Sequence, residues 1–218
     1  QHNVPRLVGH NAGMEAMKEI VRRASDLGIK YLTVYLFSTE NWRRSQEEVK
    51  ALMKLFHSYT RTAIRQAREN NMRCRVLGKE DELDDTLRKN LRELVESSRN
   101  NTGLNFQLAI NYGSRDEIVR AVRKLSEDVK TGRIGDPSQI TEETISSYLD
   151  TADIPDPDLM IRTSGEQRLS NYLLWQLAYS EFYFTDVLWP DFTKEELSKA
   201  IEYYNGRDRR FGGVKEGE

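Results

Sequence analysis

Short apolar runs alternate with amphipathic segments along the whole chain, and this alternation constrains the fold more than any other feature. Runs typical of strands cover residues 31–37, 72–76, 104–110, 158–162 and 181–184. Between them, apolar residues recur at helical spacing, as at Met14, Met17 and Val21. Strands that alternate with helices predict an α/β fold with a mostly parallel central sheet flanked by helices.

Capping signals predict where helices begin and end. Ser45 with Glu48, and Thr193 with Glu196, have the spacing of capping boxes. Gly28 is a suitable stop for the first helix. A polar helix is also expected over about 82–99, and a helix that carries Ile118, Val119, Val122 and Leu125 is expected after the strand at 104–110. In such sheets ligands bind beyond the carboxyl ends of the strands, so the loops there are the first places to search for a site.

Composition excludes several classes of protein. The chain has 218 residues, with 33 Lys+Arg and 35 Asp+Glu, and the resulting net charge of −2 argues against general binding of nucleic acid. We expect a single domain over residues 1–218. No apolar run approaches the ~18 residues that span a bilayer. The single cysteine, Cys74, favours a cytoplasmic location and is expected to be structural, as is His57.

Three polar clusters follow or precede the predicted elements. Residues 162–171 contain two arginines, three hydroxyls and a glycine after a strand, which favours an anion site over an incidental solvated loop. Residues 6–13 place Arg6 and His10 at a helix start, where anions are favoured; a capping or packing role for His10 is the alternative. Residues 38–44 are interpreted as a mobile lid with an exposed Trp42, or as an ordinary turn with Trp42 on the core.

Other chemistries lack their motifs. Three histidines without a His-x-x-x-His pair disfavour zinc, and no glycine-rich nucleotide loop is present. The acidic stretch 80–85 is interpreted as a solvated helix start. Two anion clusters at neighbouring strand ends therefore suggest a pair of substrates that each carry phosphate.

Several motifs together resemble one known family. They are Gly9–Gly13, Phe37–Trp42, Asn111–Gly113, Asp158–Glu166, Ser170–Gln176, Glu181–Phe184, Leu188–Phe192 and Arg209–Gly213. In order and spacing they are similar to the cis-prenyltransferases, of the bacterial undecaprenyl diphosphate synthase type. The resemblance implies a homodimer that extends farnesyl diphosphate with isopentenyl diphosphate, using Mg²⁺, to make a lipid carrier for cell-wall synthesis. It also implies a cytoplasmic enzyme, with peripheral membrane contact for product release.

The resemblance carries roles to individual positions. Arg162, Arg168 and Ser170 would bind the diphosphate of isopentenyl diphosphate, and Arg6 and His10 that of the allylic substrate. Ser38 and Asn41 would position the reacting groups and the departing proton, while Trp42, Arg44 and Glu48 would close over the substrates. Glu181 would be associated with the metal, and Arg210 and Gly212 would reach the partner's site.

One expected segment has no counterpart in the sequence. The family's first strand ends in an aspartate loop that binds Mg²⁺, and that segment would precede Gln1. We therefore expect the domain to be N-terminally incomplete and residues 1–218 alone not to form polyprenyl products. The alternative is a non-catalytic binding or partner subunit. An apolar product tunnel is expected along Met14, Met17, Leu52 and Phe56, with Leu36 and Ile110 beside it.

Overall fold

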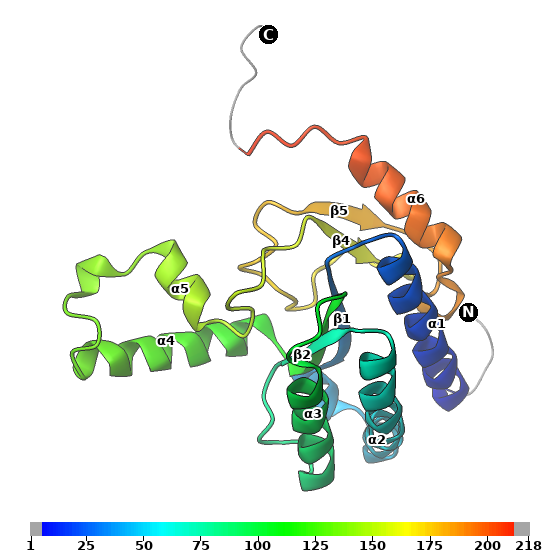
Figure 1. Cartoon of the computed structure of the whole chain (residues 1–218), viewed down its shortest axis with the longest axis horizontal. Helices are drawn as coiled ribbons and strands as arrows, with labels where there is room; N and C mark the ends of the chain where they lie inside the picture. The colour runs from blue at the N-terminus through cyan, green and yellow to red at the C-terminus, as the bar shows by residue number, and fades with distance from the viewer. Residues whose placement is uncertain (1–5, 212–218) are drawn as a thin grey trace, which may run out of the picture.

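The computed structural model describes the backbone of residues 6–211 and the side chains of residues 8–211 (Figure 1). Its α-helices are α1 (Arg6–Asp26), α2 (Gln46–Glu69), α3 (Asp85–Ser98), α4 (Ser114–Lys130), α5 (Glu142–Tyr148) and α6 (Lys194–Asn205). Its strands are β1 (Tyr31–Ser38), β2 (Arg73–Leu77), β3 (Asn105–Tyr112), β4 (Leu159–Arg162) and β5 (Glu181–Phe184). Short 3₁₀ helices are η1 (Thr39–Arg43), η2 (Pro137–Gln139) and η3 (Trp189–Asp191).

The strand pairs of the described chain are parallel, so the predicted α/β class is confirmed. A three-stranded sheet has the order β1-β3-β2, and β4 pairs with β5 in a separate two-stranded sheet. One central sheet was expected, whereas the described chain has two parallel sheets. Within the part of the chain that the structure describes, β1 pairs only with β3 and β4 only with β5.

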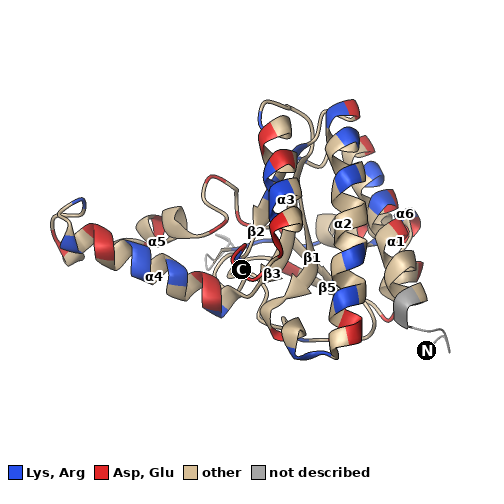
Figure 2. Cartoon of the chain, turned by 90° about the horizontal axis from the view of Figure 1, so that it is seen from below, with Lys and Arg blue, Asp and Glu red and all other residues tan. Residues whose placement is uncertain are grey.

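Strand β3 is the centre of the core because both of its faces are covered. Phe106 and Leu108 pack against α1, α2 and α3, while Ala109 faces the cluster of Met160 and Leu173 on the other side. This alternation follows from the two-residue period of a strand. Helices α1, α2 and α3 lie side by side in Figure 1, and lysine, arginine and acidic residues are interspersed on their outer surfaces in Figure 2.

The residues expected along a product tunnel are packed into this core. Met14, Met17, Leu52 and Phe56 expose between 1% and 7% of their surface. Met14 and Met17 belong to the cluster around Phe106, and Leu52 and Phe56 to the cluster around Phe37. The tunnel itself stays a prediction.

The capping predictions hold in part. The Ser45 hydroxyl accepts a hydrogen bond from the Glu48 amide at 3.3 Å, as predicted, and α2 begins there. Helix α6 begins after Thr193 as predicted, but the Thr193 side chain makes no capping hydrogen bond, so that capping box is wrong. Helix α5 was not predicted. Thr141 caps this helix, because its hydroxyl accepts a hydrogen bond from the Thr144 amide at 3.2 Å.

Helices α4 and α5 form an arm that extends away from the body of the molecule (Figure 1). The two helices contact each other, and Asp150, which follows α5, binds back to Arg120 of α4. None of the helices in the described part of the chain combines the length and apolar character that a membrane crossing requires.

Candidate functional site

The carboxyl ends of β1, β3 and β4 lead into three loops that meet, as the parallel sheet predicts. Asn171, in the loop after β4, accepts a hydrogen bond from the Ser114 amide at 2.8 Å with its carbonyl. Its side chain accepts from the Arg115 amide at 2.9 Å and donates to Glu40 at 2.8 Å. Asn171 therefore joins the loop of residues 162–171, here called the arginine loop, to the carboxyl ends of both β1 and β3.

The turn after β1 is anchored at residues 38–42. The Ser38 amide donates to Asn41 Oδ1 at 3.0 Å, and the Trp42 indole donates to Asn111 Oδ1 at 2.8 Å. The Trp42 ring also meets Phe37 edge-to-face, with 5.0 Å between centroids. The expectation of an exposed Trp42 is wrong, because Phe37 and the buried Asn111 amide offer it apolar and polar partners at once. Its packing on the core is the alternative that holds.

Glu40 in this turn is kept ionised by hydrogen bonds. Burial acts to raise the pKa of its carboxyl, but hydrogen bonds from the Asn171 side chain, its own backbone amide, Thr39 and Ser38 outweigh that effect and lower the pKa. The turn thus carries a fixed negative charge beside the arginine loop.

A second group of predicted residues meets at the starts of α1 and α2. Arg44 Nη1 lies 2.8 Å from Glu48 Oε1, and His10 Nε2 lies 3.6 Å from the same oxygen. Glu48 is the most enclosed of the three, with 9% of its side chain exposed. Arg6 is the first residue of α1, but its side chain lies outside the described residues. The predicted cluster of residues 6–13 therefore forms the first turns of α1, at the helix start where it was expected.

The loop that begins at Arg162 is fastened to the end of β5. The Ser164 amide donates to Val187 at 2.8 Å and the Gly165 amide to Thr185 at 3.0 Å. Gly165 has a φ of +70°, and a Cβ there would lie 3.0 Å from Asp186 Oδ1. Arg168 pairs with Glu166 and stays exposed, while Ser170 has a φ of +50°. A non-glycine residue in that region is uncommon and is held by its surroundings.

Three tyrosines, Tyr35, Tyr112 and Tyr172, pack against one another beside the arginine loop. This cluster was not predicted from the sequence. Tyr35 stacks on Tyr172 with 4.5 Å between ring centroids, and Tyr112 meets both edge-to-face. The Tyr35 hydroxyl donates to the Tyr112 carbonyl at 3.0 Å and approaches the Ser170 carbonyl at 3.4 Å. Burial raises the pKa of Tyr35 first, and Glu40 raises it further, so this hydroxyl stays a donor. Each tyrosine lies next to one of the motif loops, and this proximity in the sequence is the signal that could have predicted the cluster.

A buried carboxyl group lies behind these tyrosines. Tyr112 donates its hydroxyl proton to Glu117, which also accepts from the Asp150 amide at 2.8 Å and from Gln176 at 3.3 Å. Burial raises the pKa of Glu117, an effect that the neighbouring Asp150 increases and the hydrogen bonds from Tyr112 and Gln176 oppose. Sequence reasoning missed Glu117 because an acidic residue in the first turn of a helix is usually solvated.

Glu181 and Arg210 lie away from the arginine loop. Glu181 begins β5, at the opposite end of the two-stranded sheet from Arg162, and it accepts from Arg207 Nε at 3.0 Å. Arg210 pairs with Asp208 at 3.5 Å, and Gly212 lies outside the described residues. Among the residues with described side chains, no three His, Cys, Asp or Glu groups gather closely enough to hold a metal ion.

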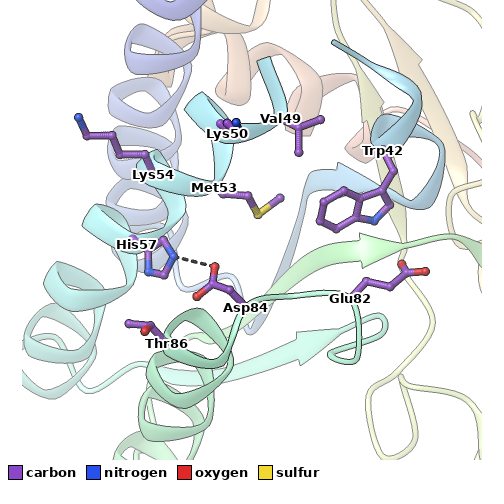
Figure 3. Close-up of a pocket in the computed structure, with 9 residues that line it drawn as sticks. All are labelled: Trp42, Val49, Lys50, Met53, Lys54, His57, Glu82, Asp84 and Thr86. Carbon is purple, nitrogen blue, oxygen red and sulfur yellow. Dashed lines mark hydrogen bonds and ion pairs between the residues drawn. The ribbon is translucent and has the colours of Figure 1, made fainter. Parts of the chain in front are cut away.

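A groove of about 680 Å³ opens between α2 and the segment before α3 (Figure 3). Trp42, Val49 and Met53 form apolar parts of its wall, and Lys50 and Lys54 lie along α2. His57 Nε2 lies 2.8 Å from Asp84 Oδ2, and Asp84 caps α3 by accepting from the Leu87 amide. This geometry agrees with a structural His57 and with a helix start in the acidic stretch.

Comparison with known proteins gives consistent matches over nearly the whole chain. The sequence profile of a family described as putative undecaprenyl diphosphate synthase matches residues 1–212. An isoprenyl transferase of Brucella abortus is 52% identical, over 97% of this chain and 83% of the relative. An isoprenyl transferase of Bacillus thuringiensis is 49% identical, over 97% and 81%.

Solved structures give the same result for the fold. Lavandulyl diphosphate synthase from Lavandula x intermedia, solved with dimethylallyl diphosphate, superposes with a TM-score of 0.92 at 38% identity, over 96% of this chain and 90% of that one. A probable undecaprenyl diphosphate synthase from Campylobacter jejuni has a TM-score of 0.82 at 33% identity, over 93% and 92%.

Proposed function

Because the chain belongs to the undecaprenyl diphosphate synthase family of prenyltransferases, we propose that it joins isopentenyl diphosphate to farnesyl diphosphate and builds a cis-polyprenyl diphosphate. The product would be of the undecaprenyl type and serve as a lipid carrier in bacterial cell-wall synthesis. The observation that carries this proposal is the meeting of the arginine loop with the turn after β1 through Asn171. Isopentenyl diphosphate bound by the arginine loop would then lie beside the turn that carries Ser38 and Asn41, where the reacting groups are oriented.

The residues divide between the two substrates. Arg162, Arg168 and Ser170 hold the diphosphate of isopentenyl diphosphate, since guanidinium groups match phosphate oxygens in shape and charge. Arg6 and His10 hold the allylic diphosphate at the start of α1, where the helix dipole favours an anion. Glu166 is the present partner of Arg168, and the incoming diphosphate replaces it.

The reaction breaks the carbon–oxygen bond of the allylic diphosphate and forms a carbon–carbon bond to the isopentenyl alkene, which then loses a proton. Ser38 and Asn41, held together at the end of β1, orient these groups and the departing proton. Trp42, Arg44 and Glu48 cover the substrates and exclude water from the ionised allylic group. Fixed positive charge around the leaving diphosphate stabilises the charge that develops there.

Members of this family generally depend on Mg²⁺, which supplies charge neutralisation at the leaving diphosphate. The described residues do not by themselves fit the ion: Glu181 is bound to Arg207 at the far end of β5, away from Arg162. No step is therefore assigned to the metal.

The protein is further proposed to act as a homodimer in the cytoplasm, with peripheral membrane contact when product is released. In the dimer, Arg210 and Gly212 would reach the partner's site. The alternative of a non-catalytic binding subunit is not favoured, since the similar proteins are described as transferases and both arginines of the loop are present.

The test is the substitution Arg168→Ala. Removing one charge-assisted contact costs about 1.5–3 kcal/mol, so affinity for isopentenyl diphosphate should fall roughly ten- to a hundredfold, measured by calorimetric titration and by the KM for chain elongation. Affinity for farnesyl diphosphate should change much less. Equal losses for both substrates would contradict the assignment.

Arg99→Ala is the matched control. Arg99 is 63% exposed and paired with Glu96 at 2.9 Å, much as Arg168 is 64% exposed and paired with Glu166. It follows α3 at the amino ends of the strands, far from the arginine loop. The control should bind and elongate as the unmodified protein does.

A further inference from the structure

Helix α4 begins without a cap of its own. The residue before it is Gly113, which has no side chain that could accept hydrogen bonds from the free backbone amides of the first turn. Asn171 supplies both acceptors from a distant loop: its carbonyl accepts from the Ser114 amide at 2.8 Å and its Oδ1 from the Arg115 amide at 2.9 Å. In return the Ser114 hydroxyl accepts from the Leu174 amide at 3.0 Å.

The other half of the Asn171 carboxamide points to the turn after β1. Its Nδ2 donates to Glu40 Oε1 at 2.8 Å, and Thr39 donates to the other oxygen of the same carboxylate at 3.1 Å. One planar amide thus spans from the start of α4 to the turn that carries Ser38 and Asn41.

Gly113 shows how closely the three segments approach. A Cβ at this position would lie 2.5 Å from Thr39 Oγ1 and 2.9 Å from Asn171 Nδ2, so no larger residue fits between them. Asn171 itself has a φ of +61°, a conformation that asparagine tolerates better than most residues. The backbone and the side chain of this position are therefore both specified by the junction.

We propose that Asn171 is a positioning residue that fixes the arginine loop against the turn after β1, and so sets the distance between the two bound substrates. This inference rests on the proposed function. Asn171 need not touch either substrate: Ser170 is its neighbour in the chain, and Glu40 connects it to the turn that holds Ser38 and Asn41.

The decisive variant is Asn171→Asp, which keeps the shape and the acceptor for the Arg115 amide. It replaces the donor to Glu40 by a second carboxylate, so the turn and the loop are pushed apart. A small misplacement of bound reactants can cost about a hundredfold in rate. We therefore expect the kcat of Asn171→Asp to be at least about tenfold lower than that of the unmodified enzyme. The affinity for each substrate alone should change less than about threefold.

A reciprocal swap tests whether the bond itself matters. In the double variant Asn171→Asp with Glu40→Gln, the introduced glutamine amide donates to the introduced carboxylate, so donor and acceptor are exchanged and one negative charge remains. The kcat of the double variant should return to within about threefold of Glu40→Gln alone, the non-additivity expected for residues in direct contact. Independent losses that multiply would overturn the proposal, as would an Asn171→Asp enzyme with unchanged kcat.

Asn71→Asp is the control for a general effect on folding. Asn71 also has a positive φ, +53°, and its side chain also accepts from a backbone amide and donates to an oxygen, both of Thr102 at 3.0 Å. It precedes β2, at the amino ends of the parallel strands, whereas the site lies at their carboxyl ends. This variant should keep its kcat; an equal loss would assign the effect to stability.

Amide hydrogen exchange separates this inference from the proposed function. If the unmodified enzyme does not join the two diphosphates, the proposed function fails, and exchange still tests the junction. Asn171→Asp should speed exchange across residues 39–42 while the amides of Ser114 and Arg115 stay protected, because only the bond to Glu40 is lost. Unchanged exchange in residues 39–42 would overturn the junction.

Discussion

At the scale of single residues, Glu117 shows how the site is supported from the interior. It is 1% exposed and accepts hydrogen bonds from Tyr112, Gln176 and the Asp150 amide. Because Tyr112 in turn contacts Tyr35 and Tyr172, the carboxyl group helps to fix the floor of the arginine loop. A buried carboxyl group is costly to ionise, and the raised pKa of Glu117 is the sign of that cost.

This raised pKa predicts a pH dependence of stability. Below about pH 4.3, Glu117 is protonated in both the folded and the unfolded chain. As the pH rises, the unfolded chain loses this proton first, so the free energy of unfolding falls until the pH passes the folded pKa. Glu117→Gln cannot titrate. Between pH 4 and 7, urea unfolding should therefore show the unmodified protein losing stability relative to Glu117→Gln, by about 1.4 kcal/mol for each pH unit that separates the folded from the unfolded pKa. Parallel pH profiles would contradict this prediction.

The sequence predicted residue types better than their surroundings. It singled out Arg162, Ser170 and the turn at Ser38 as site candidates, because polar residues after a buried strand are a local signal. It included Asn171 in the polar cluster but gave it no role of its own, because its partners Glu40 and Arg115 are separated from it by 131 and 56 residues. It also left open whether Trp42 is exposed or packed on the core, since the buried acceptor on Asn111 belongs to another strand. Contacts of this kind depend on how the chain folds back on itself.

At the scale of elements, the turn after β1 combines an anchored residue with an open segment. Trp42 is fixed by Asn111 and Phe37, but residues 43–47 are all exposed before α2 becomes partly buried at Glu48. Segments with few buried contacts open easily. Residues 43–47, which follow the anchored Trp42, are therefore the weakly held part of this cover, and residues 38–42 are its hinge.

Amide exchange across residues 38–48 measures this opening. Without ligand, exchange should be faster there than in β1, and it should slow when a farnesyl diphosphate analogue is added, because Arg44 and Trp42 then contact the ligand in addition to Glu48, Asn111 and Phe37. The amides of β2 provide an internal control, since they lie within the sheet and should not respond. If residues 38–48 already exchange as slowly as β1 without ligand, the segment is a rigid turn.

Element prediction succeeded where a pattern was local. The strands and the helices with a clear apolar period were found, and the Ser45 cap was correct to the residue. Helix α5 was missed because its seven residues offer too few apolar positions for a period. The Thr193 cap was expected from spacing alone, but its side chain makes no capping hydrogen bond in the folded chain.

At the scale of the whole molecule, the arm of α4 and α5 is the part with least support from the body (Figure 1). Val119 and Val122 lie on α4 three residues apart, which places them on one face, and they are 47% and 50% exposed. Exposed apolar residues that cluster on a projecting element mark a surface for association. No local pattern in the sequence predicts that this face is uncovered, because that depends on the direction in which the arm leaves the sheet.

The proposed homodimer should therefore depend on this face of α4. Val122→Asp would place a carboxylate in an apolar contact, where an uncompensated charge costs several kcal/mol, so the dissociation constant of the dimer should rise at least ~100-fold. Sedimentation velocity over a range of protein concentrations measures the change. Val8→Asp is the matched control: Val8 is 51% exposed, but it lies on α1, so this variant should stay dimeric. An unmodified protein that sediments as a monomer would contradict the homodimer, while equal dissociation of both variants would contradict the placement of its interface on α4.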